Sequence, residues 1–409
     1  MPVNHSGVIS SVLACSLAMS VAGCSVDGSD PAPITSTKQA VHGDNSAFVR
    51  IFRPLSRESL TLAAEVTLGQ DRLCQLQADI IGDGAANGLD DDDPDDGGWD
   101  FSLDTDATEH STSPSPQNTY GSTALALLAR GAANPRALGC ALDAALGMQA
   151  RPEVDSPPDF VFWVLLGQLL ENPGFAELAA ARYDAKVAAA GGAQALGESI
   201  QELRHNAGDD GLIPYDLAWL TFAALGLDTA LPSDGYRADA ETYAGLIASD
   251  LRSATPLFDR NDGTEAFYTD GLSWSLLALH AVDLRPGLQR ALKRLLLGVQ
   301  LPNGAFGFNQ DFPEPDLQAT AGALLALELA GTGADRRERR AAIGYLVGQQ
   351  TADGGWDYAP GLESTQANAD VLLALGRARE TPLESGALIA SSAPAARRSA
   401  SRPLAFPID

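Results

Sequence analysis

The tetrapeptide Leu324-Leu325-Ala326-Leu327 occurs three times in the chain. The copies begin at Leu276, Leu324 and Leu372, so that successive copies are 48 residues apart. A helical segment repeated at a fixed interval of this size is typical of proteins built from stacked helical units. The second and third copies each follow a turn that contains Gln, Gly and an aromatic residue. We therefore expect a repeat architecture.

Apolar helical segments alternate with turns rich in Gly, Pro and Asp between about residues 50 and 380, and no stretch keeps up a strand-like alternation. The pattern predicts an all-α domain of twelve helices in six pairs. The expected helices are 57–78, 118–131, 135–149, 159–171, 174–206 (interrupted at Gly191-Gly192), 216–226, 237–253, 270–282, 286–300, 316–330, 335–350 and 365–379.

The two helices of each pair differ in composition. The segment 319–327 is apolar all round, which is typical of a helix without a solvated face, whereas 336–343 carries four Arg and one Glu beside apolar residues. We expect helices of the first kind inside and helices of the second kind outside. Six such pairs can close into a ring that has no ends to cap. The predicted fold is a closed (α/α)6 toroid.

A turn motif joins each outer helix to the next inner helix. Its best copy has Gln350, Gly354 and Trp356, and Gln300 and Phe306 occupy the matching positions 50 residues earlier. Gly permits a tight reversal, the Gln amide supplies hydrogen bonds at a helix end, and the ring covers the turn. Partial copies lie at 96–99, which includes Trp99, and at 210–212.

This repeat resembles that of terpenoid cyclases and protein prenyltransferase β subunits, the squalene-cyclase-like family, over about residues 50–380. The resemblance implies two rings of helices around a central cavity, with the Gln-Trp turns joining the layers. Cyclases of the family use the middle Asp of Asp-x-Asp-Asp-Thr-Ala as an acid. Here 316–321 reads Asp-Leu-Gln-Ala-Thr-Ala, and 119–124 and 364–369 contain no acid. The cyclase acid catalyst is missing from these stretches.

Prenyltransferases of the same family use a zinc site of Asp, Cys and His. The region 50–380 has no Asp-x-Cys motif, and no Ser-His-Asp or Cys-His grouping stands out, so the catalytic residues stay unknown.

Acidic residues recur at the starts of the predicted inner helices. A carboxylate there caps its own helix, or, in a closed ring, joins a crown at one mouth that favours a cation. Three tryptophans on inner helices either pack in the core or line the cavity for a ligand. The acids are Asp159, Asp216, Asp270, Asp316 and Glu363, and the tryptophans are Trp163, Trp219 and Trp274.

The sequences of the two chain ends and the net charge indicate the cellular location of the protein and the partners that it does not bind. A formal net charge of −26 argues against a nucleic-acid partner. Residues 1–23 resemble a lipoprotein signal peptide that ends before Cys24, which would carry the lipid, and 24–49 suit a flexible tether. We expect a periplasmic or outer-membrane lipoprotein, or alternatively a secreted protein. The tail 381–409 has the composition of a disordered segment.

Two further features concern oxidation and metal binding. Cys74 and Cys140 either pair in an oxidising compartment or are two buried apolar residues. An acidic insertion, 79–96, has oxygen-bearing residues at EF-hand-like spacing, so that it is a calcium loop or a plain solvated acidic loop. The expected calcium ligands are Asp79, Asp83, Asn87 and Asp90.

These observations predict an exported, lipid-anchored toroid that binds a small molecule, glycan or protein at an acidic mouth. The first alternative is a terpenoid-cyclase-like enzyme that acts on an isoprenoid with other acids, such as Asp104, Asp106 or Asp316. The second is a glycan lyase or hydrolase, because (α/α)6 toroids also serve sugar chemistry.

Overall fold

A computed structural model describes the main part of the chain. The described residues are 51–52, 62–77, 97–99, 102–104, 121–129, 134–150, 156–206, 215–232, 234–253, 269–308, 314–359, 362–378 and 382. The expected signal peptide, tether and acidic insertion lie outside these ranges, as does all of the expected tail except residue 382.

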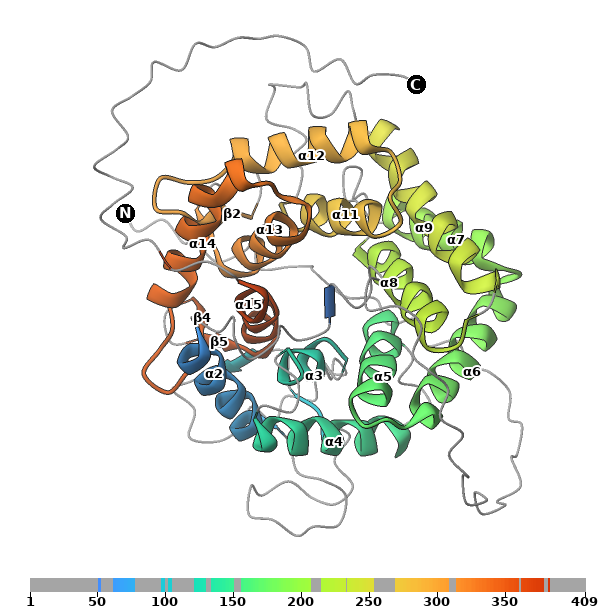
Figure 1. Ribbon diagram of the computed structural model, residues 1–409, viewed down its shortest axis with the longest axis horizontal. Coiled ribbons are helices and arrows are strands. Elements are labelled where there is room, and N and C mark those ends of the chain that lie inside the picture. Colours follow the sequence, from blue (N-terminus) through green and yellow to red (C-terminus); the bar gives the residue numbers. More distant parts are fainter. Residues whose placement is uncertain are drawn as a thin grey trace, which may run out of the picture.

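An inner ring of six helices closes on itself (Figure 1). Each inner helix contacts the next around the ring, and the last, α15, contacts the first, α3. The closed toroid is therefore confirmed by contacts within the described residues. In chain order the inner helices are α3 (Gly121–Leu127), α5 (Pro157–Leu169), α8 (Tyr215–Ala230), α11 (Thr269–Ala281), α13 (Leu317–Ala330) and α15 (Thr365–Arg377).

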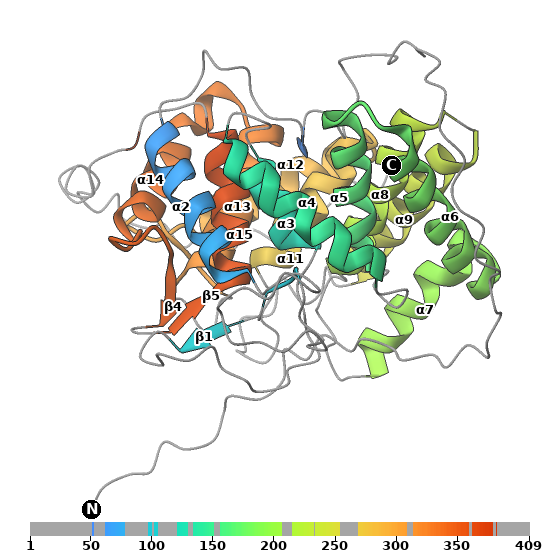
Figure 2. The ribbon, with the colours of Figure 1, turned by 90° about the horizontal axis from the view of Figure 1, so that it is seen from below.

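An outer ring surrounds the inner one (Figures 1 and 2). Gly191 and Gly192 have φ of 91° and 122°, and they separate two outer helices at the predicted interruption. The outer helices among the described residues are α2 (Ala63–Leu76), α4 (Pro135–Ala150), α6 (Pro173–Ala190), α7 (Ala193–Asn206), α9 (Asp234–Ser253), α12 (Pro286–Gly298) and α14 (Arg336–Gly348).

Burial explains which helix occupies which ring. On α13, ten of the eleven residues from Leu317 to Leu327 are buried, because the helix is covered on every side. On α12, only Ala291, Leu292 and Leu296 are buried. These three lie on one face at helical spacing, and the remaining positions carry charge or partial exposure. The sequence assignment of apolar helices to the inside is confirmed.

Within the described ranges, five short strands accompany the helices, and they were not expected from the sequence. They are β1 (Ser102–Asp104), β2 (Phe306–Gly307), β3 (Pro315–Asp316), β4 (Asp357–Ala359) and β5 (Leu362–Ser364). Strands of two or three residues are too short to show a two-residue alternation in sequence.

The order β1-β5-β4 brings segments near the two ends of the domain together, with Ser102 opposite Ser364 in antiparallel register. Figure 2 shows this sheet on one side of the ring.

Candidate functional site

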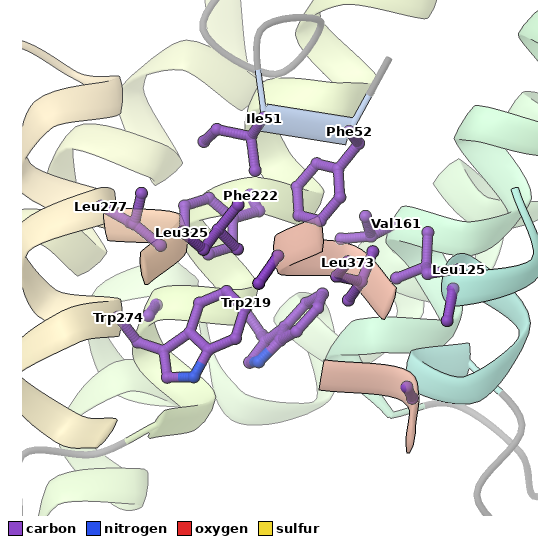
Figure 3. Close-up of a cluster of buried hydrophobic side chains, with 14 of the residues drawn as sticks. Ile51, Phe52, Leu125, Val161, Trp219, Phe222, Trp274, Leu277, Leu325 and Leu373 are labelled. Atoms are coloured by element: carbon purple, nitrogen blue, oxygen red, sulfur yellow. The ribbon is translucent and has the colours of Figure 1, made fainter. Parts of the chain in front are cut away.

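The centre of the ring is filled by a layer of apolar side chains, one or two from each inner helix (Figure 3). We call this layer the bore. Its residues are Leu125, Val161, Trp219, Phe222, Trp274, Leu277, Leu325 and Leu373, all at most 6% exposed. The ring centroids of Trp219 and Trp274 lie 4.9 Å apart, and those of Phe222 and Trp274 lie 6.0 Å apart. The aromatic residues pack on one another.

The bore has two distinct ends. Trp274 lies about one turn before Leu277 on α11, and Trp219 about one turn before Phe222 on α8. The two tryptophans therefore lie nearer the N-terminal ends of the inner helices. Ile51 lies on the side of the layer opposite the two tryptophans (Figure 3).

Carboxyl groups gather beyond the tryptophans, at the N-terminal ends of three consecutive inner helices. Asp270 is the second residue of α11, Asp316 is the N-cap of α13, and Asp370 is the sixth residue of α15. All three residues are partly exposed. We call Asp270, Asp316 and Asp370 the acidic cluster.

Two glutamines hold the carboxylate of Asp370. Gln318 Nε2, from α13, donates to Oδ2 at 3.1 Å, and Gln366 Nε2, from the first turn of α15, donates to Oδ1 at 3.1 Å. Burial, together with the charge of Asp316, raises the pKa of Asp370 to about 6 against the lowering effect of the two glutamine hydrogen bonds. Both oxygens are therefore fixed by amide donors, and none of these bonds supplies a neutralising charge.

Asp270 is influenced by both other members of the cluster. Burial raises its pKa well above the ordinary value, and the carboxyls of Asp370 and Asp316 raise it further. A hydrogen bond with the Trp274 side chain acts the other way. Gly322 of α13 makes room for the carboxyl, because a Cβ at Gly322 would lie 2.8 Å from Asp270 Oδ1. The Asp270 carboxyl therefore lies between α11 and α13, against Trp274 of the bore.

Asp316 also caps its own helix. Its Oδ1 accepts a hydrogen bond from the Ala319 backbone N–H at 2.7 Å. Burial raises the pKa of Asp316, and the backbone hydrogen bonds of Ala319 and Gln318 oppose this shift. The capping role and the place in the cluster coexist in one residue.

The other acids expected at the mouth make local contacts. Asp159 is buried and closes a capping box with Ser156, whose backbone N–H and hydroxyl donate to Oδ2 at 2.8 and 2.6 Å. Glu363, on β5, binds Arg72. Asp216 is partly exposed near the start of α8.

Of the five acids named from the sequence, the structure therefore brings Asp270 and Asp316 together. Asp370 was missed, because it lies inside a helix, whereas the acids predicted from the sequence stand at or near helix starts. The spacing Gln366-x3-Asp370 was the available signal, since residues four apart share a helix face.

The three tryptophans separate into two groups. Trp219 and Trp274 face the bore (Figure 3). Trp163 is buried on α5, and the guanidinium carbon of Arg182 on α6 lies 4.5 Å from the centroid of its ring. Trp163 therefore contacts the outer ring.

The Gln-Gly-Trp turn ties the last outer helix to the first. Gln350 Nε2 donates to the carbonyl of Glu65 on α2 at 2.9 Å and to that of Gly354 in its own turn at 3.0 Å. Gly354 has φ of 102°, and a Cβ there would lie 2.5 Å from the carbonyl oxygen of Leu68. Gly is needed both for the conformation and for the close approach of α2.

The same pair of hydrogen bonds recurs in two other turns, each reaching the next outer helix. Gln300 Nε2 donates to the carbonyls of Gly304 (3.0 Å) and Glu338 (2.9 Å), and Gln77 Nε2 donates to those of Gly97 (2.9 Å) and Cys140 (2.7 Å). Gln77 was missed in the sequence, because the insertion 79–96 separates it from the Gly-Gly-Trp of its turn.

The aromatic position of the turn distinguishes the copies. Trp356 Nε1 donates to the Leu346 carbonyl and Trp99 Nε1 to the Leu73 carbonyl, both at 2.8 Å and both four residues before the turn glutamine. Phe306 is also fully buried but has no such donor. Trp356 and Trp99 thus join their turns to the preceding outer helices, whereas Phe306 is paired with Asp316 of the acidic cluster across strands β2 and β3.

The described residues contain no group of three or more His, Cys, Asp and Glu side chains arranged to hold a metal ion. The expected calcium ligands Asp79, Asp83, Asn87 and Asp90 lie outside those residues, as do Cys24 and Asp106. Asp104 ends β1.

Cys74 and Cys140 form a disulfide between α2 and α4, with Cα atoms 5.7 Å apart. Of the two possibilities left open by the sequence, the disulfide is the one found in the structure. No described helix is long and apolar enough to cross a membrane.

No family model and no curated protein matches this chain. The chain is similar to solved structures of variants of MstE, a type II terpene cyclase from Scytonema. One, in complex with geranylgeranyl dihydroxybenzoate, has 14% identity and a TM-score of 0.40 over 77% of this chain and 97% of that one. Another, in complex with merosterolic acid A, has 16% identity and a TM-score of 0.41 over 78% and 99%. The closed ring follows from the helix contacts of this chain itself.

Proposed function

We propose that this protein is an exported, lipid-anchored α-toroid that binds a cationic group of a ligand or partner at its acidic cluster. The observation that carries the proposal is the convergence of Asp270, Asp316 and Asp370 from three neighbouring inner helices, each with a raised pKa. Carboxyls whose pKa is raised by burial and by one another gain stability when a positive charge comes close.

The chemistry of the surrounding groups favours an organic cation. Gln318 and Gln366 fix the orientation of the Asp370 carboxylate, so that its remaining acceptor sites are set in direction. Trp274 forms a side-chain hydrogen bond with Asp270, and ammonium and guanidinium groups offer several N–H donors to neighbouring carboxylates. An amine or a guanidinium is thus the class of group that fits the cluster.

The packing behind the cluster supports binding rather than turnover. Trp219, Phe222 and Trp274 contact one another in the bore, and Trp219 and Phe222 also contact Phe52. A substrate would need space at the carboxyls in which to react. With the bore occupied by side chains, the exposed edge of the cluster is the part that a ligand can reach.

Export and anchoring rest on separate features. The disulfide between Cys74 and Cys140 suits an oxidising compartment, and the segment that ends before Cys24 has the character of a lipoprotein signal. We expect the full-length protein to fractionate with membranes when it is expressed in a bacterium that processes lipoproteins. A Cys24→Ser protein should be found outside the membrane fraction, and an unchanged distribution would contradict lipidation at this residue.

Calorimetric titration with spermidine tests the cation site. The titration is run with the mature protein at about 0.15 M salt, where long-range attraction to the acidic surface is screened. The double variant Asp270→Asn/Asp370→Asn should bind at least about tenfold more weakly than wild type, which is about 1.4 kcal/mol. Asp216→Asn, on another inner helix, is the control and should bind as wild type does.

Proton release gives a second readout. Near pH 6 a cation would displace the proton from Asp370, so the measured heat should change with the ionisation enthalpy of the buffer. The proposal fails if spermidine gives no heat, or if both variants bind as wild type does.

A second candidate is an isoprenoid-converting enzyme with Asp270 as a general acid. The observation that favours it is the raised pKa of Asp270 beside Trp274, since an acid catalyst must be protonated and aromatic faces stabilise carbocations. Incubation with squalene and with labelled prenyl diphosphates tests it. Turnover that disappears in Asp270→Asn would replace the binding proposal, and turnover of a glycan panel would favour the sugar-active alternative.

A further inference from the structure

Ile51 and Phe52 lie at the centre of the ring although they precede the first helical pair in the sequence. Both are helical, and Ile51 is 4% and Phe52 2% exposed. In Figure 1 they form the short blue segment inside the inner ring, and in Figure 3 they cover one end of the bore. They are not part of any inner helix, yet they occupy the space that all the inner helices surround.

Phe52 packs in an apolar site formed by side chains of the inner helices. Its ring centroid lies 5.7 Å from that of Trp219 and 5.6 Å from that of Phe222, tilted by 36° and 70°. Besides Ile51 and Trp274, Figure 3 labels aliphatic side chains of the bore that come from several inner helices. They are Leu125, Val161, Leu277, Leu325 and Leu373.

The ring closes without help from these two residues. Each inner helix contacts its two neighbours directly. The first and last units are also joined by the hydrogen bond of Gln350 to Glu65 and the ion pair of Arg72 with Glu363. Removal of the Ile51 and Phe52 side chains should therefore leave a folded ring with an open apolar end.

We propose that Ile51 and Phe52 form a displaceable plug, which occupies a site in the bore for a helical aliphatic-aromatic pair. The site accepts the same pair from a peptide in trans when its own plug is removed. The expected ligand is a short helical peptide, because such segments are recognised through a few apolar anchor residues that fill a complementary site. In the intact protein, Ile51 and Phe52 of the same chain occupy this site. Their covalent connection gives them a high effective concentration there.

This inference goes beyond the proposed cation site and does not depend on it. The plug lies on the side of the bore opposite the two tryptophans (Figure 3), whereas Asp270 of the acidic cluster is hydrogen-bonded to Trp274. Spermidine binding and plug displacement can therefore succeed or fail separately.

The test uses a synthetic peptide that covers residues 46–57 and the full mature chain carrying Ile51→Ala/Phe52→Ala. Binding is followed by tryptophan fluorescence, since Trp219 lies against Phe52. The double variant should bind the peptide with saturation, and wild type should bind at least about a hundredfold more weakly because its own plug competes. A peptide with Ser at positions 51 and 52 is the control ligand and should not bind.

A milder variant guards against loss of the fold. Phe52→Tyr keeps the volume of the ring and adds a hydroxyl in apolar surroundings, which weakens the plug. We expect this variant to bind the peptide about tenfold more tightly than wild type. Trp219→Phe in the same background should remove most of the fluorescence response, because Trp219 is the aromatic neighbour of the plug.

Three results would overturn the proposal. The first is a folded double variant that does not bind the peptide, and the second is equal peptide affinity of Phe52→Tyr and wild type. The third is a wild-type dimer in light scattering that the double variant lacks, because the plug would then belong to a second copy of the chain.

Discussion

Arg72 and Glu363 are 291 residues apart in the sequence and form an ion pair, with Arg72 Nη2 2.6 Å from Glu363 Oε2. Arg72 is on the first outer helix, α2, and Glu363 is on β5, just before the last inner helix. Asn368 Nδ2 donates to the other carboxylate oxygen at 2.7 Å. The hydrogen bond to Glu363 raises the pKa of Arg72 against the effect of burial. The pair joins the first and last units of the ring.

Removal of Arg72 should strongly destabilise the protein. Glu363 is 2% exposed, and in Arg72→Met its charge would be left buried without the arginine. Loss of one partner of such a pair costs about 3–5 kcal/mol, to be discounted here because Arg72 is partly exposed. Urea unfolding measures the change in the free energy of unfolding.

The matched control for this prediction is Arg237→Met. Arg237 pairs with Glu241 on the surface at 3.0 Å, where the side chains are 43% and 56% exposed. This change should cost less than about 0.5 kcal/mol. Adding Glu363→Gln to Arg72→Met should restore part of the stability, because the buried charge is then absent. Equal costs for the two arginine variants would show that the Arg72 pair does not stabilise closure.

The turn glutamines should matter because each donates one hydrogen bond within its own turn and one to the next outer helix. Gln350→Leu would leave the carbonyls of Glu65 and Gly354 without their amide donor. We expect a loss of about 1–3 kcal/mol in the free energy of unfolding. Gln349→Leu is the control, because Gln349 is exposed and adjacent in the sequence. If both variants have the same midpoint in thermal unfolding, the turn does not tie the outer ring.

Because the pKa of Asp370 is raised in the folded protein, we expect this residue to make stability fall as the pH rises. Because this pKa is about 6 in the folded chain and about 4 in the unfolded chain, the folded protein holds the proton more tightly. Its contribution to stability is present below about pH 4 and is lost as the pH rises through about 6. Asp370→Asn should therefore stabilise the protein at pH 7.5, by about 1–2 kcal/mol after allowance for partial exposure, and have little effect at pH 4.

Asp335 serves as a control, because its pKa is shifted in the opposite direction from that of Asp370. Burial acts to raise its pKa, but the hydrogen bonds from Thr332 and Lys293 lower it overall. Its contribution to stability is present above the unfolded pKa and is lost as the pH falls through the lower folded value. Asp335→Asn should destabilise the protein at pH 7.5, with a smaller effect in acid. Urea midpoints of both variants over pH 4–8 that run parallel to wild type would contradict these assignments.

The sequence predicted the rings well because burial leaves a strong pattern. Inner helices such as α13 are apolar all round, and the glycines that end α6 interrupt the pattern at the right place. The parts that it missed depend on contacts between distant segments. Asp370 joins the acidic cluster only because α11, α13 and α15 are neighbours, and Gln77 reaches its turn across the insertion. Ile51 and Phe52 look like an ordinary apolar start to the domain, and only the three-dimensional ring makes them a plug.

The acidic insertion 79–96 remains a predicted calcium loop, with Asp79, Asp83, Asn87 and Asp90 as its oxygen ligands. In the sequence it follows α2, whose Cys74 is bonded to Cys140 on α4. A ligand that binds only the folded state at about a hundred times its Kd adds about 2.7 kcal/mol. We therefore expect a chelator to lower the Tm by a few degrees and added calcium to restore it. Asp83→Ala should abolish the response, whereas Asp71→Ala, before the insertion, should keep it; an unchanged Tm with chelator would leave a plain solvated acidic loop.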